Sequence, residues 1–155
     1  MSWQGKVLAI HIGEISQPLN SVASVEAQAG VGLTGDRYGI GAGTFSKKNS
    51  PDREITLIEQ EAIEALEREY QISISPGEAR RNVTTQGVPL NHLVGKQFKV
   101  GEVVLQGIRL CEPCGHLEKL LARGKVQEGL RHRGGLRAQI LKGGVIKAGD
   151  VVTSV

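Results

Sequence analysis

The sequence has 155 residues and a formal net charge of +3, with 39% hydrophobic and only 3% aromatic residues. This length suits one domain, residues 1–155, with enough chain to bury a core. Two cysteines are too few for a disulfide-built secreted scaffold. No apolar run reaches the roughly 18–20 residues of a membrane span, and the first run is too short for a signal peptide. We therefore expect a cytoplasmic protein with no membrane partner and, because aromatic residues for base stacking are scarce, no nucleic-acid partner.

The first third of the chain predicts strands and a glycine-rich loop. Residues 6–12 and 21–28 alternate apolar and polar side chains, as half-buried strands do. The glycines at 30, 32 and 35 spell a dinucleotide-binding pattern, but more glycines follow where a helix would have to open. We interpret the stretch as a long loop that could wrap a ligand. Asp36 and Arg37 in it form either a local ion pair or a contact to an anion.

The middle of the chain predicts a structural helix and a pair of polar side chains that could bind a ligand. A short strand over 54–58 precedes a helix over 59–70, whose apolar side chains recur at i, i+4 spacing. In the next segment, 78–85, an extended backbone would put Arg80 and Asn82 on one face and the intervening arginine on the other. A guanidinium and an amide on one face can hold a phosphate or a heterocycle edge. A solvated arginine pair on an edge strand is the alternative.

The last third predicts a hairpin, a short helix and two closing strands. The hairpin covers 96–110, the helix 125–132, and the strands 136–141 and 150–154, with turns and loops between the strands. The paired glycines Gly134 and Gly135 would permit close backbone approach to a ligand. Many short strands separated by glycine turns favour a β-rich α+β fold, a mixed-strand barrel with a few peripheral helices.

The two cysteines, Cys111 and Cys114, lie in one segment at the predicted strand-to-helix junction. Pro113 suits a first helical turn, so Cys114 would feel the positive end of the helix dipole and favour the thiolate, a nucleophile and soft metal ligand. Three alternatives remain. Cys114 could be a small buried apolar residue. The pair could be a thioredoxin-like redox pair, although the βαβ pattern that accompanies such a motif is not seen here. Both cysteines could also bind zinc together with His116 and His132.

Charge is concentrated near the C-terminus. Between Lys119 and Lys147 there are eight Lys or Arg residues and one acidic residue, Glu128. Such a region favours an anionic ligand, although a solvated basic face would give the same count.

Several motifs together resemble the MOSC domain, named for the C-terminal domain of molybdenum cofactor sulfurase. They run in family order over nearly the whole chain: Gly32–Arg37, Ile55–Ile58, Arg80–Asn82, Leu90–Gly95, Phe98–Gly101, Cys111–Cys114 and Arg133–Arg137. No desulfurase domain accompanies them, and Tyr38 stands where the family often has histidine.

The resemblance implies a barrel-containing fold that binds the pyranopterin molybdenum cofactor. Cys114 matches the family cysteine proposed to ligate molybdenum or carry sulfur, and would be the catalytic residue. Arg80 and Asn82 match a cofactor-contacting Arg-x-Asn motif. Asp36, Arg37, Arg133, Gly134 and Gly135 are further candidates for cofactor binding. Pyridoxal phosphate comes with the resemblance by family association only.

Two functions follow from these expectations. The first is a protein that holds or delivers the cofactor or sulfur through Cys114, with a cysteine desulfurase or a molybdoenzyme as partner. The second is a molybdenum-dependent oxidoreductase that reduces N-hydroxylated compounds with a separate electron-donor protein.

Overall fold

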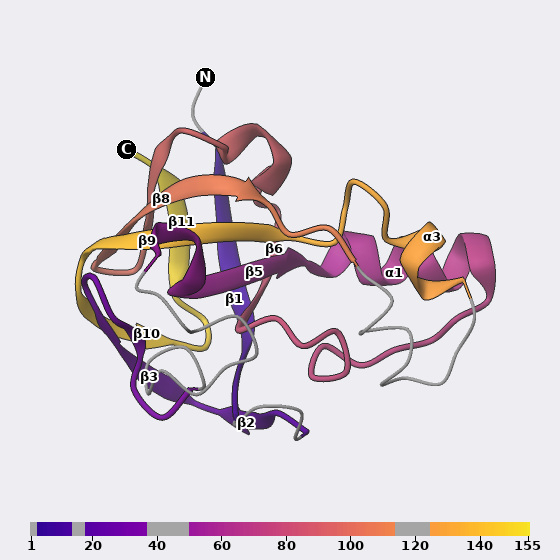
Figure 1. Cartoon of the computed structure of the whole chain (residues 1–155), viewed down its shortest axis with the longest axis horizontal. Coiled ribbons are helices and arrows are strands. Elements are labelled where there is room, and N and C mark those ends of the chain that lie inside the picture. Colours follow the sequence, from indigo (N-terminus) through magenta and orange to yellow (C-terminus); the bar gives the residue numbers. More distant parts are fainter. Residues whose placement is uncertain (1–2, 14–17, 37–49, 114–124) are drawn as a thin grey trace.

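The computed structural model describes residues 3–13, 18–36, 50–113 and 125–155. Within them, seven strands close a barrel in the order β11-β7-β8-β9-β5-β6-β1, and β1 pairs back with β11 (Figure 1). These are β1 (Gln4–Ile12), β5 (Ile55–Glu59), β6 (Val83–Gln86), β7 (Gln97–Val100), β8 (Val103–Leu110), β9 (Leu136–Lys142) and β11 (Val151–Ser154). β5 and β6 pair in parallel and the other neighbours antiparallel. The predicted mixed barrel is confirmed.

A smaller sheet lies beside the barrel, and the sequence predicted it only in part. Residues 21–28 form two strands, because β2 (Asn20–Val22) pairs with β1 whereas β3 (Ser24–Gln28) pairs with β10 (Gly144–Lys147) and β4 (Gly32–Leu33). The prediction of one strand there was wrong. The strand β10 was not predicted at all. Its partner β3 is distant in sequence, so no local pattern reveals the pairing.

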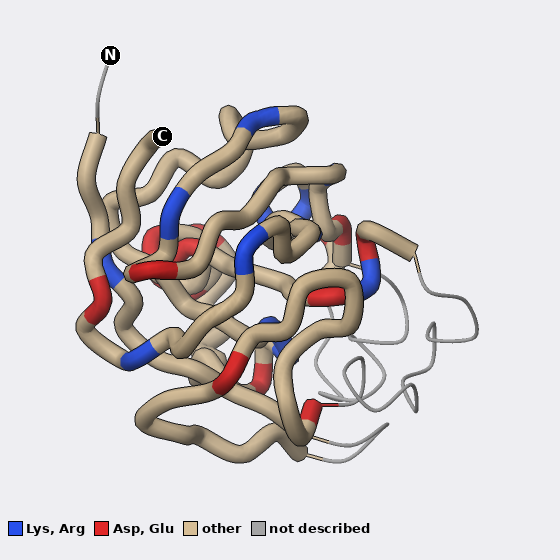
Figure 2. Tube along the Cα trace, turned by 90° about the vertical axis from the view of Figure 1, so that its left-hand side faces the viewer, with Lys and Arg blue, Asp and Glu red and all other residues tan. Residues whose placement is uncertain are grey.

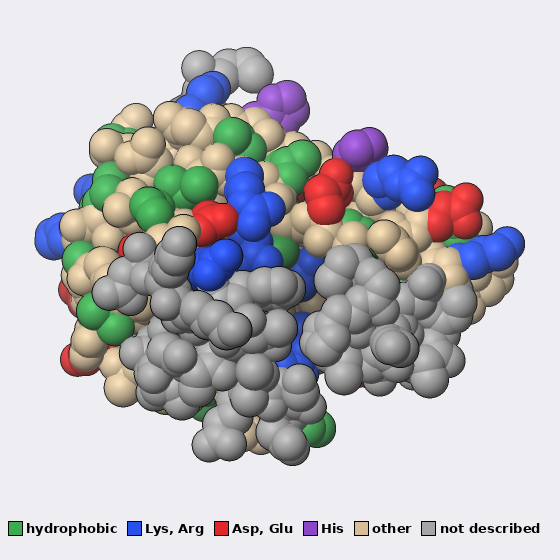
Figure 3. Space-filling model, viewed as in Figure 1, with side chains coloured by type: hydrophobic (Ala, Val, Ile, Leu, Met, Phe, Trp, Pro, Cys, Tyr) green, Lys and Arg blue, Asp and Glu red, His purple; other side chains and the backbone are tan. Residues whose placement is uncertain are grey.

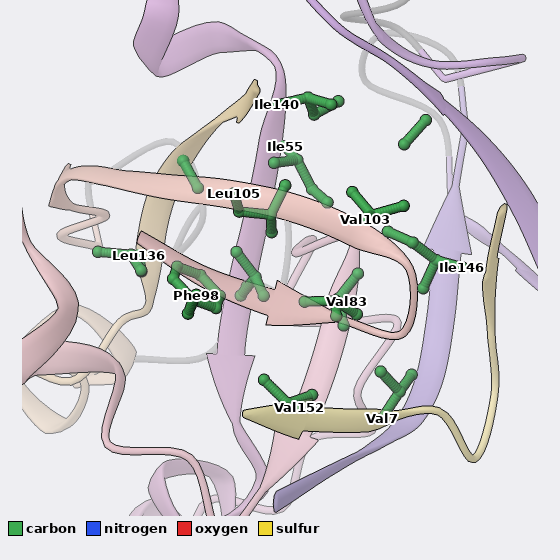
Figure 4. Close-up of a cluster of buried hydrophobic side chains, with 14 of the residues drawn as sticks. Val7, Ile55, Val83, Phe98, Val103, Leu105, Leu136, Ile140, Ile146 and Val152 are labelled. Atoms are coloured by element: carbon green, nitrogen blue, oxygen red, sulfur yellow. The ribbon is translucent and has the colours of Figure 1, made fainter. Parts of the chain in front are cut away.

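The inward-facing side chains of the strands fill the barrel. Figure 4 shows Phe98, Leu105 and Ile140 among the aliphatic side chains of this cluster, and all three are at most 1% exposed. Alternation along the strands puts every second residue inside, as in the buried-exposed pattern of β7 and the first half of β8. A core of Val, Ile and Leu with a single Phe agrees with the low aromatic content.

Two helices cover one side of the barrel and enclose a second apolar cluster. The predicted helix is confirmed as α1 (Gln60–Tyr70). Its buried side chains, Ala62, Ile63 and Leu66 among them, belong to the same cluster as Ile58 of β5. The other helix, α3 (Val126–Gly129), is shorter than predicted, because residues after it form a turn in which His132 has a φ of 64°. Gly129 lets the helices approach closely, since a Cβ there would meet Leu66. The single turns η1 (Pro51–Arg53) and η2 (Leu90–Leu93) complete the described elements.

The described basic residues near the C-terminus belong to different elements. Arg131 and Arg133 follow α3, whereas Lys142 ends β9 and Lys147 ends β10. Figure 2 shows Lys and Arg positions interspersed with Asp and Glu along the trace. Among the described residues, no helix is long and apolar enough to cross a membrane.

Candidate functional site

Five strands bring the candidate residues to one row of the barrel wall. The strand registers align Leu110 with Leu136, Leu136 with Leu57, Leu57 with Val83, and Val83 with Ile10. Cys111, Gly135, Asn82 and His11 each flank a member of this row in sequence. Segments more than a hundred residues apart therefore meet around this row. We call the five aligned residues the site row: Leu110, Leu136, Leu57, Val83 and Ile10.

The backbone that leads into Cys114 is held from several directions. The Cys111 N–H donates to the carbonyl of Gly135 at 2.7 Å. Both carboxylate oxygens of Glu112 contact His132, one the backbone N–H at 2.6 Å and the other Nδ1 at 2.7 Å. Asn91 of η2 in turn donates to the His132 carbonyl. These bonds connect Cys111 and Glu112 to the turn between α3 and β9.

Cys114 itself, the predicted ligand and nucleophile, lies outside the described residues, as does His116 of the zinc alternative. Cys111 is 2% exposed and belongs to the core. Within the described ranges, no three His, Cys, Asp or Glu side chains are grouped to hold a metal ion.

Arg81 is the site residue that sequence reasoning missed. The residue is 9% exposed, and its guanidinium donates to three backbone carbonyls: Nε to Gly134 at 2.8 Å, Nη2 to Cys111 at 3.2 Å, and Nη1 to Ala79 at 3.4 Å. No carboxylate among the described residues pairs with it. The only signal in the sequence is the double arginine, and strand alternation predicts that its two side chains point to opposite faces.

Arg81 thus places a positive charge next to the backbone of Cys111 and Gly134. Neutral carbonyls satisfy its donors but do not neutralise it, and a buried charge without a counter-ion is costly. An anion bound near this point would offset that cost. On the face seen in Figure 3, Lys and Arg side chains gather toward the middle, with Asp and Glu side chains beside them.

The glycine pair permits a close approach, but to the protein's own backbone. A Cβ on Gly134 would lie 2.5 Å from the Cys111 carbonyl oxygen and 2.8 Å from Cδ of Pro113. A Cβ on Gly135 would collide with the Leu57 carbonyl oxygen, and its φ is +122°. These contacts give each glycine a structural reason of its own, and they do not test the sequence interpretation in which the pair permits close approach to a ligand. Their contact to a cofactor stays a prediction.

Arg133 holds the two helices together. Its Nε donates to the Gly129 carbonyl at 2.7 Å, and its Nη2 forms an ion pair with Glu69 of α1 at 2.9 Å. The hydrogen bond from Arg133, with a second from Arg68, lowers the pKa of Glu69 below its usual value. In this arrangement the guanidinium of Arg133 serves the packing of α3 on α1.

Arg80 and Asn82 do not share the face of a strand. β6 begins only at Val83, and Arg80 has a φ of 59° in the preceding turn. Because its backbone is left-handed, the predicted alternation with Asn82 fails. Asn82 is fully buried: its Oδ1 accepts bonds from the N–H and the hydroxyl of Thr56, and its Nδ2 donates to the His11 carbonyl at 3.1 Å. Its amide therefore joins β5, β6 and β1.

Asn82→Ala is expected to lower the free energy of unfolding by about 3 kcal/mol, because three buried hydrogen bonds lose a partner. Urea denaturation measures this change. Asn20→Ala, at an exposed position of β2, is the matched control and should change stability by less than about 0.5 kcal/mol. Equal losses in the two variants would contradict the structural role of Asn82.

Asp36 and His11 extend the site row at the end of β1. Asp36 is fully buried, and its Oδ1 accepts a bond from the Gly13 N–H at 3.1 Å. Arg37 lies outside the described residues. His11 is 9% exposed, and its Nδ1 has no hydrogen-bond partner among the described residues. Burial lowers the pKa of His11, which favours the neutral ring. The sequence offered one sign of it, a histidine that interrupts an apolar run.

The fold and the site define a small mixed β-barrel protein with a buried arginine beneath a cysteine-bearing segment. The family model described as the MOSC domain matches residues 32–153, and the chain belongs to this family. The family is associated with binding of the molybdenum cofactor. No curated protein matches the sequence.

Solved structures share the fold at low sequence identity. The YUAD protein from Bacillus subtilis aligns with a TM-score of 0.81 and 17% identity, over 100% of this chain and 98% of that one. YiiM from Geobacillus stearothermophilus gives 0.75 and 17%, over 97% and 75% of the two chains. YiiM from Escherichia coli gives 0.69 and 18%, over 100% and 70%. At these sequence identities, the similarities show that the chains share a fold.

Proposed function

We propose that the protein binds the molybdenum cofactor beside the site row and holds or delivers cofactor or sulfur through Cys114. The observation that carries the proposal is the buried guanidinium of Arg81, which contacts the carbonyls of Cys111 and Gly134 and has no carboxylate partner in the described part of the chain. Membership of the MOSC family supports the identity of the ligand.

The donor set suits this cofactor. A thiolate at Cys114 is a soft ligand of the kind that a soft or intermediate transition metal accepts. The cationic fork of Arg81 and the turn at Arg80 would favour the anionic part of the ligand. When bound, the cofactor supplies a molybdenum centre for transfer of oxygen or sulfur. Asn82, with its amide engaged, would serve mainly to hold β6 and its preceding turn in place.

In the sulfur-carrying role, Cys114 would accept sulfur from a cysteine desulfurase. The Cys114 thiolate attacks the outer sulfur of the donor's persulfide, R–S–SH. A new S–S bond forms at Cys114, the donor S–S bond breaks, and the donor leaves as a thiolate. The outer sulfur keeps its proton, and the exchange needs no external oxidant or reductant. A molybdoenzyme would then be the recipient of sulfur or loaded cofactor.

The first test is molybdenum analysis of protein purified anaerobically from cells that make the cofactor. We expect molybdenum in the wild type and in Cys111→Ala, which changes the buried cysteine, and its loss in Cys114→Ser. Absence of molybdenum from all three proteins, together with no mass gain at Cys114 after treatment with a cysteine desulfurase, would contradict the proposal.

The same preparation separates carrier from enzyme. A carrier transfers its cofactor or sulfur to an apo-molybdoenzyme. An oxidoreductase would reduce N-hydroxylated purines with an artificial electron donor. Turnover by the loaded protein would replace the carrier role with the oxidoreductase role.

A further inference from the structure

A separate pocket opens at the end of the barrel where β1 and β7 begin and β11 ends. The registers bring these ends together, because Gln4 pairs with Thr153 and Phe98 with Ser154. η2 forms another side of the pocket through Leu93, and Trp3 precedes β1 on its wall. The pocket is partly open to solvent and has a volume of about 750 Å³, within the roughly 300–1,000 Å³ of small-molecule pockets. It shares no residue with the site row.

The lining combines an aromatic face with an apolar floor. Trp3 is half-buried and packs against the barrel core while it lines the pocket. Leu93 is 4% exposed and belongs to the same core. A tryptophan held in this way offers a rigid flat surface at low entropic cost, which suits a planar ring.

The polar side of the lining is cationic. Lys96 is exposed, and no ion pair holds it among the described residues. None of the lining residues carries a side-chain carboxylate, while His92, Gln97 and Ser154 add groups that form hydrogen bonds. A ligand here would meet the apolar surfaces of Trp3 and Leu93 and the positive charge of Lys96.

We propose that this pocket binds a small planar aromatic carboxylate, with the ring against Trp3 and the carboxylate toward Lys96. Trp3 offers a ring-sized apolar surface, and Lys96 forms no ion pair with a carboxylate of the described residues, so the pocket favours an anionic aromatic ligand over a neutral or cationic one. The proposal is independent of the cofactor, and its test does not involve Cys114.

The test uses 2-naphthoate and its neutral analogue 2-naphthamide as probes. The chain has one tryptophan, so the indole N–H gives one cross-peak in a ¹⁵N–¹H NMR spectrum that reports on this pocket alone. We expect saturable shifts of the peak, with 2-naphthoate binding about fivefold more tightly than 2-naphthamide, the effect of one partly exposed charge pair.

Lys96→Gln should abolish the preference for the carboxylate and leave the affinity for 2-naphthamide unchanged. Lys99→Gln makes the same change at an exposed position of β7 outside the pocket and should keep the preference. No saturable shift with either probe would overturn the proposal. Equal affinity for the two probes in the wild type, or an undiminished preference in Lys96→Gln, would overturn it as well.

Discussion

Gly135→Ala is expected to lower the free energy of unfolding by about 4 kcal/mol or to prevent folding altogether, an effect found only where a substitution meets a specific structural obstacle. Gly135 has a φ of +122°, and a Cβ there would overlap the carbonyl oxygen of Leu57. That oxygen belongs to β5, at the centre of the site row, and cannot move without disturbing the barrel. Chemical denaturation of the purified variant measures the loss.

Gly149→Ala is the control that measures the cost of a positive φ without the collision of a Cβ with neighbouring atoms. Gly149 also has a positive φ, +93°, but nothing lies within 4 Å of the position of its Cβ. Its replacement should cost only about 1–2 kcal/mol, the price of a left-handed conformation for a residue with a side chain. Similar losses at both positions would show that the close approach of Gly135 to β5 does not limit stability.

Arg81→Gln is expected to lower the free energy of unfolding by about 3 kcal/mol, because the carbonyls of Ala79, Cys111 and Gly134 lose their donor. Removing a buried charge recovers some desolvation energy. That gain is the smaller effect, since a guanidinium is weakly hydrated and glutamine cannot span three acceptors. Thermal and urea unfolding measure the change.

Arg131→Gln is the matched control, since Arg131 is exposed in the turn after α3. It should stay within about 0.5 kcal/mol of the wild type. Arg81→Lys should recover only part of the loss, because an ammonium group lacks the planar fork. If Arg81→Gln were as stable as Arg131→Gln, the fork would not hold the cysteine segment. If the variant folds, its molybdenum content should also fall, because the positive charge is gone.

Local patterns predicted the elements that need only local information. The apolar spacing over 59–70 makes one face of a helix, and the structure has α1 there. Alternation and turn residues predicted the β7–β8 hairpin, whose strands are neighbours in sequence. Short strands and glycine turns were enough for the barrel class. The ordered motifs pointed to the family that the family model also matches.

Local patterns did not predict the features that depend on segments distant in the sequence. β10 has its partner at β3, and the break at Ala23 arises because β2 and β3 join different sheets. Arg80 could not be assigned without knowing that the turn before β6 takes a left-handed residue. The glycine pair suggested close approach to a ligand, whereas the groups that the structure places against Gly134 and Gly135 are the backbone atoms of Cys111 and Leu57.

The sequence by itself determined the helix, the hairpin, the β-rich class and the family, whereas the chemistry of Cys114 stays a prediction. Only the tertiary structure decided which of the two adjacent arginines is buried and donates to the Cys111 carbonyl. It also decided that the side-chain amide of Asn82 forms its hydrogen bonds with Thr56 and His11. The physical reason is that periodicity determines which face of an element a side chain occupies. Burial and hydrogen-bond partners depend on strands that meet only when the barrel closes.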